Sequence, residues 1–351
     1  MTLPSRPPSE VPRQAVRLLV VDPAARRDEV VPFARFPQLL GEGDLLVVND
    51  AATLPASLPA RTQTGEELEV RLFDGDGAAW QAVLFGPGDW KTRTEDRPPP
   101  GAVAVGARLN FGSLSAQVIA VSAVSARLLR LQFLGPPEAL WSLVYARGAP
   151  IQYAYRSEPA PLWTVQNVYA TRPWAAENPS AGRPLSWDLL LEVRRRGARV
   201  AALTHATGLS STGDPALDAT LPLPERYEIP AATAEAVNRA VRNRNRVIAV
   251  GTSVMRALES SALVTGTVAA GPSIAGLLIT EHHRPRVVHG LLTGVHSPQE
   301  SHYRLLRSLV DAETMTHATA TARNERLVEH ELGDAVLLLP GALSPATRRS
   351  G

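Results

Sequence analysis

The sequence predicts an α/β protein whose main domain is interrupted by a small inserted β-barrel. Two observations lead to this class. From residue 67 to residue 149, short apolar runs alternate with turn residues, as in small barrels, and outside this stretch buried strands alternate with amphipathic helices. A length of 351 residues also suits two bodies better than one core. We therefore expect a discontinuous α/β domain over residues 1–66 and 150–351 and a barrel domain over residues 67–149.

The first predicted strands come from apolar runs near the N-terminus. Residues 17–22 and 45–49 each form such a run, and turn residues precede the second. The expected barrel strands, which alternate with Gly, Pro and Asp, are residues 68–73, 80–85, 107–111, 115–121 and 128–133. Residues 92–101 contain three consecutive prolines, which predicts an exposed loop.

After residue 150 the pattern changes to alternating strands and helices. Ser186 is a good helix cap, and the spacing of Leu189, Leu190 and Val193 predicts a helix that continues to Arg195. The other expected strands are residues 200–203, 246–250, 274–279 and 335–339, and the other expected helices are residues 231–242, 253–263 and 299–310. This order of elements is typical of an α/β fold.

The composition excludes several classes of protein. The chain has no cysteine, which rules out disulfides, Cys-ligated zinc, iron–sulfur clusters and thiol nucleophiles. No apolar run reaches the roughly 18–20 residues that span a bilayer, and residues 1–17 lack the apolar centre of a signal peptide. We therefore expect a cytoplasmic protein without membrane contact.

The charge and the missing motifs narrow the function further. Lysine and arginine total 36 against 34 acidic residues, and Lys91 is the only lysine. Arginine suits bidentate phosphate recognition, but GC-rich codon usage gives the same composition, and a net charge of +2 is no nucleic-acid footprint by itself. The sequence lacks the glycine-rich fingerprints of dinucleotide and nucleoside triphosphate sites and the Gly-x-Ser-x-Gly motif of α/β-hydrolases.

The strongest local signal is the junction at Gly251. A buried strand runs into this glycine, and Thr252 and Ser253 open the following helix, where free backbone N–H groups are available to an anion or a nucleoside. At about 100° per residue, Thr252, Arg256 and Glu259 share one helix face. We expect this polar face to point away from the core, either toward a ligand or, as the simpler alternative, toward solvent with an Arg256–Glu259 ion pair.

Two histidines follow apolar segments. His205 ends a predicted strand and enters a loop of glycine and small hydroxylated residues, 206–214, which suits a substrate cradle or a plain surface loop. His296 closes the apolar segment 287–295 in the same way. Five of the eight histidines fall between His282 and His302, at spacings that match no helix-borne zinc motif, so we expect no metal site.

Several motifs occur in the order found in one known family. The longest are Gly-Asp-Leu-Leu-Val-Val-Asn-Asp at residues 43–50 and the block from Arg246 to Glu259, which includes Arg-Val-Ile-Ala-Val-Gly-Thr-Ser. The shorter ones are Glu-Val at 69–70, Gln-Asn-Val-Tyr at 166–169, Pro-Ser-Ala-Gly at 179–182 and Gly-Asp-Ala at 333–335. On these motifs the sequence resembles, nearly from end to end, the S-adenosylmethionine:tRNA ribosyltransferase-isomerases (QueA) of queuosine biosynthesis.

The resemblance implies an α/β domain with an inserted barrel, in agreement with the residue pattern. Enzymes of this family transfer the ribosyl group of S-adenosylmethionine to 7-aminomethyl-7-deazaguanine in tRNA, rearrange it to an epoxycyclopentanediol, and release adenine and methionine without a metal. The resemblance therefore implies S-adenosylmethionine as a co-substrate, tRNA as a partner and no permanently bound cofactor. It implies nothing about the oligomeric state.

Some family positions differ in this chain. Two family arginines are replaced by Ala52 and Ser57 and a family histidine by Pro184, whereas His205 and His296 are retained. Loss of the arginines removes phosphate contacts. Two alternatives to the family reaction therefore stay open: a diverged paralogue that uses a small-molecule acceptor, and a non-catalytic member that binds a nucleoside or nucleic acid.

The family chemistry needs a base near the 5′ carbon of S-adenosylmethionine, whose protons the sulfonium acidifies, and a group that assists the departure of adenine. The catalytic candidates are His205, His296 and Glu259. We expect the donor between the Gly251 turn and the loop after His205, with its methionine carboxylate held by Arg256. The candidate substrate-binding residues are Asn49, Asp50, Ser180, Gly251, Thr252, Ser253, Arg256 and Tyr227.

Overall fold

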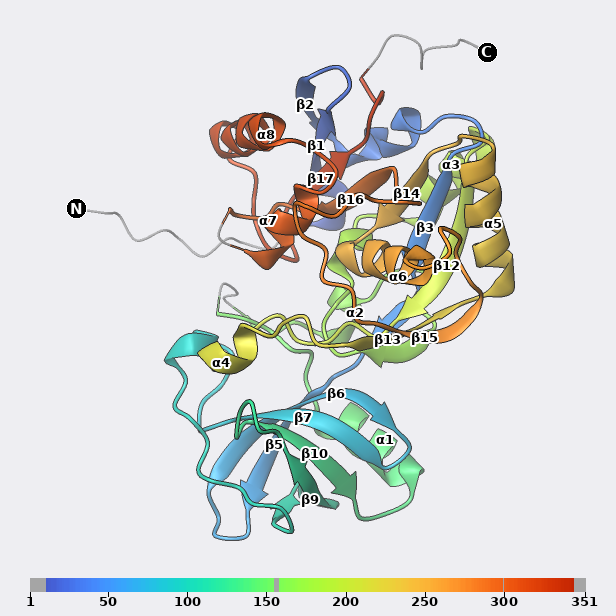
Figure 1. Ribbon diagram of the computed structural model, residues 1–351. Coiled ribbons are helices and arrows are strands. Elements are labelled where there is room, and N and C mark those ends of the chain that lie inside the picture. The colour runs from blue at the N-terminus through green and yellow to red at the C-terminus, as the bar shows by residue number, and fades with distance from the viewer. Residues whose placement is uncertain (1–10, 155–157, 299, 344–351) are drawn as a thin grey trace, which may run out of the picture.

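The computed structural model of the chain describes residues 11–154, 158–298 and 300–343. It confirms the predicted class, an α/β domain with an inserted β-barrel (Figure 1). A nine-stranded sheet forms the larger body, and a closed six-stranded barrel forms the lower body in Figure 1. Among the described residues, no helix has both the length and the apolar character needed to cross a membrane.

Four parallel strands form the centre of the large sheet. Strand β3 pairs with β12 on one side and with β14 on the other, and β14 pairs with β16. The carboxyl ends of these four strands therefore lie at one edge of the sheet. In sheet order the strands are β15 (Gly271–Ala275), β13 (Glu225–Ile229), β12 (Arg199–His205), β3 (Leu45–Asn49), β14 (Val247–Val250), β16 (Gly290–Gly294), β17 (Ala335–Leu338), β1 (Arg17–Asp22) and β2 (Arg27–Pro32).

Helices cover both faces of this sheet. Side chains alternate along β3, so Leu45 and Val47 pack into one apolar cluster and Leu46 and Val48 pack into the other. The first cluster includes α5 (Ala231–Arg242), α6 (Thr252–Ala262), α7 (Ser301–Leu306) and α8 (Ala312–Asn324), and the second includes α3 (Trp187–Arg195) and the 3₁₀ segment η2 (Phe33–Leu39). Because both faces are buried, the central strands are continuous apolar runs in the sequence.

The barrel is closed by the pairing of its last two strands, β9 and β10. Helix α1 (Pro137–Arg147) contributes Leu140, Leu143 and Val144 to the barrel core. The chain enters and leaves the barrel at one place, because Ser57 and Ala149 exchange two backbone hydrogen bonds of 3.0 and 2.9 Å. The barrel strands are β5 (Ser57–Thr62), β6 (Glu67–Asp76), β7 (Ala79–Phe85), β8 (Arg108–Asn110), β9 (Ser115–Val121) and β10 (Leu128–Phe133).

Shorter elements complete the fold. Strand β4 (Ala51–Thr53), which leads into the barrel, pairs in parallel with β11 (Arg172–Ala175) on the returning chain. The remaining segments are η1 (Arg13–Ala15), η3 (Thr94–Asp96), α2 (Leu162–Val165), η4 (Ser180–Gly182) and α4 (Pro215–Asp218).

The structure corrects the predicted start of the barrel and the nature of one loop. The first barrel strand, β5, begins at Ser57, ahead of the expected boundary at residue 67. Its outward positions carry a proline and polar groups, so it contains no apolar run. The stretch 92–101 is not a plain exposed loop, since Arg97 is buried and its guanidinium pairs with Glu69.

Two elements of the α/β domain also differ from expectation. Strand β15 spans Gly271–Ala275, earlier than the predicted 274–279. The helix expected over 299–310 spans only Ser301–Leu306, and Gln299 lies outside the described residues. By contrast, α5 covers the predicted range of 231–242.

Candidate active site

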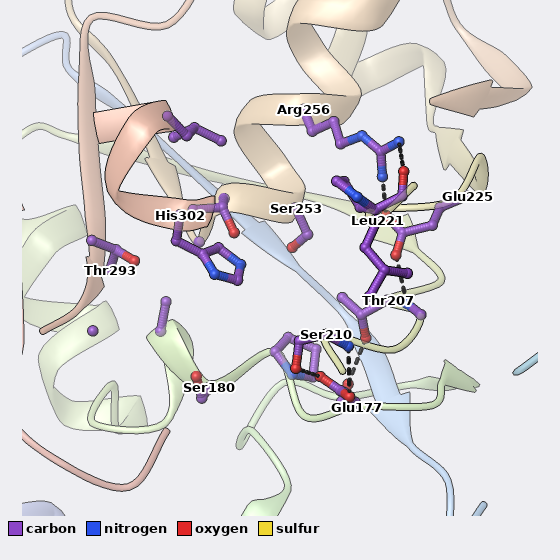
Figure 2. A pocket seen from close by; sticks show the side chains of 18 of the residues that line it. Glu177, Ser180, Thr207, Ser210, Leu221, Glu225, Ser253, Arg256, Thr293 and His302 are labelled. Atoms are coloured by element: carbon purple, nitrogen blue, oxygen red, sulfur yellow. Dashed lines mark hydrogen bonds and ion pairs between the residues drawn. The ribbon is translucent and has the colours of Figure 1, made fainter. Parts of the chain in front are cut away.

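A pocket opens where the parallel strands of the large sheet end (Figure 2). Residues at or just after the carboxyl ends of three of these strands line it. They are residues 251–253 after β14, residues 207–210 after β12, and Thr293 and Gly294 at the end of β16. Ligands of α/β proteins bind at this edge. The pocket therefore lies where the sequence predicts the donor, between the Gly251 turn and the loop after His205.

The turn at Gly251 depends on glycine. Its φ of 95° and ψ of 152° lie in a region that glycine alone enters without strain. A Cβ atom at this position would lie 3.5 Å from the Cβ atom of Ala181, so η4 packs closely against the turn. Ser180 on η4 and Ser253 on α6 both line the pocket beside it.

Arg256 is engaged by the protein itself. Its Nη1 donates to Glu225 Oε2 at 2.6 Å, its Nε donates to the carbonyl of Leu277 at 2.9 Å, and its Nη2 donates to the carbonyls of Leu223 and Pro222 at 3.0 and 3.3 Å. The residue is buried. Arg256 lines the pocket together with Thr252, but its guanidinium already makes four hydrogen bonds within the protein, so we no longer expect it to hold a methionine carboxylate as a bidentate fork. Its ionic partner is Glu225, and not Glu259 as the simpler alternative from the sequence had it.

The carboxyl groups of Glu177 and Glu225 line the same side of the pocket as Arg256. They face Thr293 and His302 across it (Figure 2). Burial raises the pKa of Glu225 to about 7, although the charge of Arg256 acts in the opposite direction. Burial also raises the pKa of Glu177, which accepts hydrogen bonds from the backbone and hydroxyl of Ser210 at 2.9 and 2.8 Å. This side of the pocket thus offers carboxyl oxygen atoms to a ligand.

His205 lies behind the pocket wall. Its side chain is fully buried, and among the described residues neither ring nitrogen has a hydrogen-bond partner, although Nε2 is 3.3 Å from Glu225 Oε2. Burial, together with the charge of Arg256, lowers the pKa of His205 to about 3. The ring is therefore neutral, and a ligand in the pocket does not reach it without rearrangement.

Three predicted binding residues support this wall from behind. The Asn49 side chain donates to the His205 carbonyl and accepts from the His205 backbone N–H, each at 2.9 Å. The ring of Tyr227 lies edge-on to His205 at 6.4 Å. Asp50 accepts hydrogen bonds from Thr204 and Thr171 at 2.6 and 3.0 Å. None of the three lines the pocket.

Glu259, a predicted catalytic residue, is held by backbone groups. Its carboxylate accepts from the N–H groups of Arg286, Val287 and Val288 at 2.9–3.0 Å and lies 3.2 Å from His283 Nε2. The side chain is fully buried and does not line the pocket. In this fold Glu259 anchors the segment that leads into β16, and we no longer propose it as a catalytic residue.

His296 also lines the pocket, beside Thr293 and His302. Its Nδ1 lies 2.8 Å from Glu300 Oε2, and its Nε2 lies 3.0 Å from Thr293 Oγ1. The ring stacks on His302 with a centroid distance of 4.8 Å and an interplanar angle of 14°. Burial, and after it the charge of His296, lowers the pKa of His302 to about 4.

The side chains around His296 also include a group that could be tested as a metal site. His296, Glu300 and His302 each bring one donor atom within 4.8 Å of the other two, and they are the one group of this kind among the described residues. A metal lies in the plane of an imidazole that binds it. Two rings stacked nearly in parallel do not point their lone pairs at one ion, so the arrangement does not fit a metal site.

The predicted site residues thus separate into two groups. The pocket is lined by Ser180, Gly251, Thr252, Ser253, Arg256 and His296, whereas Asn49, Asp50, His205, Tyr227 and Glu259 lie outside it. Sequence reasoning missed Glu177, Glu225 and His302. Only Glu225 had a detectable signal, because it lies two residues before Tyr227, a predicted binding residue.

Comparison with known proteins gives consistent similarity along the chain. Residues 2–338 match the family model described as "Queuosine biosynthesis protein". A curated S-adenosylmethionine:tRNA ribosyltransferase-isomerase of Gloeobacter violaceus is 35% identical over 94% of this chain and 91% of its own length. Proteins of the same name from Moorella thermoacetica and Thermus thermophilus are 30% and 33% identical, over 93% and 86% of this chain and 94% and 86% of their own lengths.

One solved structure has a similar fold. The crystal structure of an S-adenosylmethionine tRNA ribosyltransferase from Thermotoga maritima aligns with a TM-score of 0.51 and 21% identity, over 97% of this chain and 99% of that chain. At this identity the match concerns the fold alone.

Proposed function

This chain belongs to the queuosine biosynthesis protein family, and from that premise we propose how its pocket serves the family reaction. The chain is an enzyme of the S-adenosylmethionine:tRNA ribosyltransferase-isomerase type. End-to-end similarity to enzymes of this name carries the assignment. The alignments cover 94% and 93% of this chain and 91% and 94% of the two relatives. Nothing in the comparisons favours a diverged paralogue or a non-catalytic binder.

S-adenosylmethionine binds, in this proposal, between the Gly251 turn and residues 207–210. The first turn of α6 offers backbone N–H groups to the methionine carboxylate, in place of the occupied guanidinium of Arg256. The sulfonium and the ammonium of the donor are positive, and the carboxyl groups of Glu177 and Glu225 line the side of the pocket that faces Thr293 and His302. The charge distribution of the pocket therefore orients the donor.

The acceptor in the proposal is 7-aminomethyl-7-deazaguanine in tRNA. The ribosyl group of S-adenosylmethionine is transferred to its amine and rearranged to an epoxycyclopentanediol, with release of adenine and methionine. S-adenosylmethionine is consumed as a co-substrate, and we assign no permanently bound cofactor. A tRNA substrate is also the reason to expect the protein in the cytoplasm.

One experiment tests the reaction directly. The purified protein is incubated with S-adenosylmethionine and tRNA that carries 7-aminomethyl-7-deazaguanine; the nucleosides are then analysed by mass spectrometry, and adenine is quantified by chromatography. We expect epoxyqueuosine and adenine in equal amounts. Adenine release with a small-molecule amine but not with tRNA would instead identify the small-molecule paralogue. Binding of S-adenosylmethionine without any adenine release would identify a non-catalytic binder.

A further inference from the structure

We propose that Glu300 and Thr293 hold His296 as the proton acceptor of the pocket, with Glu300 as a positioning residue. The inference rests on the proposed function and specifies which group accepts the proton. It is carried by a chain of hydrogen bonds that runs from Glu300 through the imidazole to Thr293.

The chemistry of the three groups determines which atom donates and which accepts in each of these hydrogen bonds. An ionised carboxylate only accepts hydrogen bonds, so the 2.8 Å contact with Glu300 Oε2 places the imidazole proton on Nδ1 of His296. Burial acts to raise the pKa of Glu300, but the hydrogen bond from His296 acts to lower it and the pKa lies below its usual value, which favours the ionised carboxylate. Nε2 then has a free lone pair, and the hydroxyl of Thr293 donates to it at 3.0 Å.

This arrangement has the features of a general base. His296 and Thr293 both line the pocket, so Nε2 is accessible to a ligand once the Thr293 hydroxyl rotates away. A carboxylate on Nδ1 selects the tautomer and stabilises the imidazolium that proton transfer creates. His205, by contrast, is fully buried, and among the described residues its Nδ1 has no hydrogen-bond partner.

His302 completes the arrangement. Its ring stacks on His296, and it stays neutral because burial opposes its protonation. The low pKa of His302 means that its ring adds no second positive charge beside His296.

The proton transfer balances without any further reagent. Nε2 of His296 forms a bond to a hydrogen on the 5′ carbon of S-adenosylmethionine, and the C–H bond breaks. The electron pair stays on this carbon next to the positive sulfur, and the proton stays on the imidazole, where Glu300 compensates its charge. The products are a neutral sulfur ylide at the reacting centre and an imidazolium.

The test measures this step in isolation. The enzyme is incubated in D2O with S-adenosylmethionine, and deuterium at the 5′ carbon is quantified by mass spectrometry; kcat and KM are then measured with tRNA. For His296→Ala we expect a loss in exchange and kcat of about 100-fold or more, partly restored by added imidazole. For Glu300→Gln we expect kcat to fall about 10- to 100-fold with KM for S-adenosylmethionine within about twofold. The matched control is Glu313→Gln, an exposed acid on α8 that lies outside the pocket.

A second measurement is independent of how well the variants fold. Nitrogen-15 NMR of the wild-type enzyme reports the tautomer of His296, and we expect the proton on Nδ1. A proton on Nε2 would overturn the inference, as would a Glu300→Gln variant with wild-type kcat. A wild-type enzyme that forms no epoxyqueuosine would instead contradict the proposed function. Activity abolished by a chelator and restored by zinc would replace the base with a metal site.

Discussion

Arg256 and Glu225 lie 31 residues apart in the chain, yet Nη1 of one meets Oε2 of the other at 2.6 Å. Arg256 belongs to the helix that starts at the Gly251 turn, and Glu225 begins strand β13. The pair therefore ties the helix on which the donor site is built to the strand beside the loop that faces it. Since Glu225 also accepts from the N–H of Gly208 at 2.6 Å, one carboxylate joins α6 to the loop after β12.

Arg256→Ala tests this connection. The change leaves the Glu225 carboxylate and three carbonyls without their donor, so we expect the free energy of unfolding in urea to fall by about 3–5 kcal/mol. Arg239→Ala is a control, because Arg239 forms an exposed i,i+4 pair with Glu235 and should cost less than about 1 kcal/mol. Equal effects of the two changes would show that Arg256 is no anchor.

Glu259→Ala should affect stability and spare binding. The buried backbone N–H groups of Val287 and Val288 and the part-buried N–H of Arg286 lose their acceptor, and we expect the free energy of unfolding to fall by about 3 kcal/mol or more. The affinity for S-adenosylmethionine, measured by calorimetry well below the melting temperature, should stay within about twofold. A selective loss of affinity in a stable variant would return Glu259 to the site.

Glu225 should make stability depend on pH. Its pKa in the folded protein is about 7, above the unfolded value of 4.5, so the folded state favours the protonated form. Its contribution to stability is present below pH 4.5 and is lost as the pH rises through 7. We expect the wild type to lose on the order of 3 kcal/mol relative to Glu225→Gln over this range. Parallel urea-denaturation curves for the two proteins at every pH would contradict this.

His205 should make stability depend on pH in the opposite direction to Glu225. Its folded pKa of about 3 lies below the unfolded value of 6.5, so the folded state favours the neutral ring. This contribution is present above pH 6.5 and is lost as the pH falls toward 3. Thermal denaturation of wild type and His205→Asn between these pH values should show the wild type losing stability faster on acidification. If the variant is the more acid-sensitive protein, the ring is charged in the fold.

Gly251→Ala should disturb both the fold and the donor site. The positive φ costs alanine about 1–3 kcal/mol, and the added methyl group projects toward Ala181 and Ser253 at the pocket. We expect lower stability and weaker binding of S-adenosylmethionine by calorimetry. Gly276→Ala is the matched control, because a Cβ there meets no atom within 4 Å and its φ is not positive.

Elements with local signals were predictable. The Ser186 cap accepts from the backbone of Leu189, as its position before an amphipathic run indicates, and α5 ends where its apolar period ends. Strand β5 and helix α1 lack such signals: β5 carries Pro59 on its outward side, and α1 has apolar residues around much of its circumference. Their structure comes from contacts with the rest of the barrel.

The site was only half predictable, for a related reason. The helical period shows that Thr252, Arg256 and Glu259 share a face, but it does not show what covers that face. In the fold, Arg256 is covered by the segment around Leu223 and Leu277, and Glu259 by the backbone of residues 286–288. Both charged groups are consequently anchors, and the exposed polar stripe expected from the sequence does not exist.

The contact between Ser57 and Ala149 also bears on the order in which the chain folds during synthesis. All six barrel strands lie between these residues, so they emerge from the ribosome before β12 and β14, the two neighbours that β3 requires. Strand β1 waits longer still, for β17 at Ala335. A nascent chain that has reached residue 190 should therefore carry all six barrel strands while β3 still lacks both neighbours and β1 has only β2, and exposed strand edges of this kind are prone to aggregation.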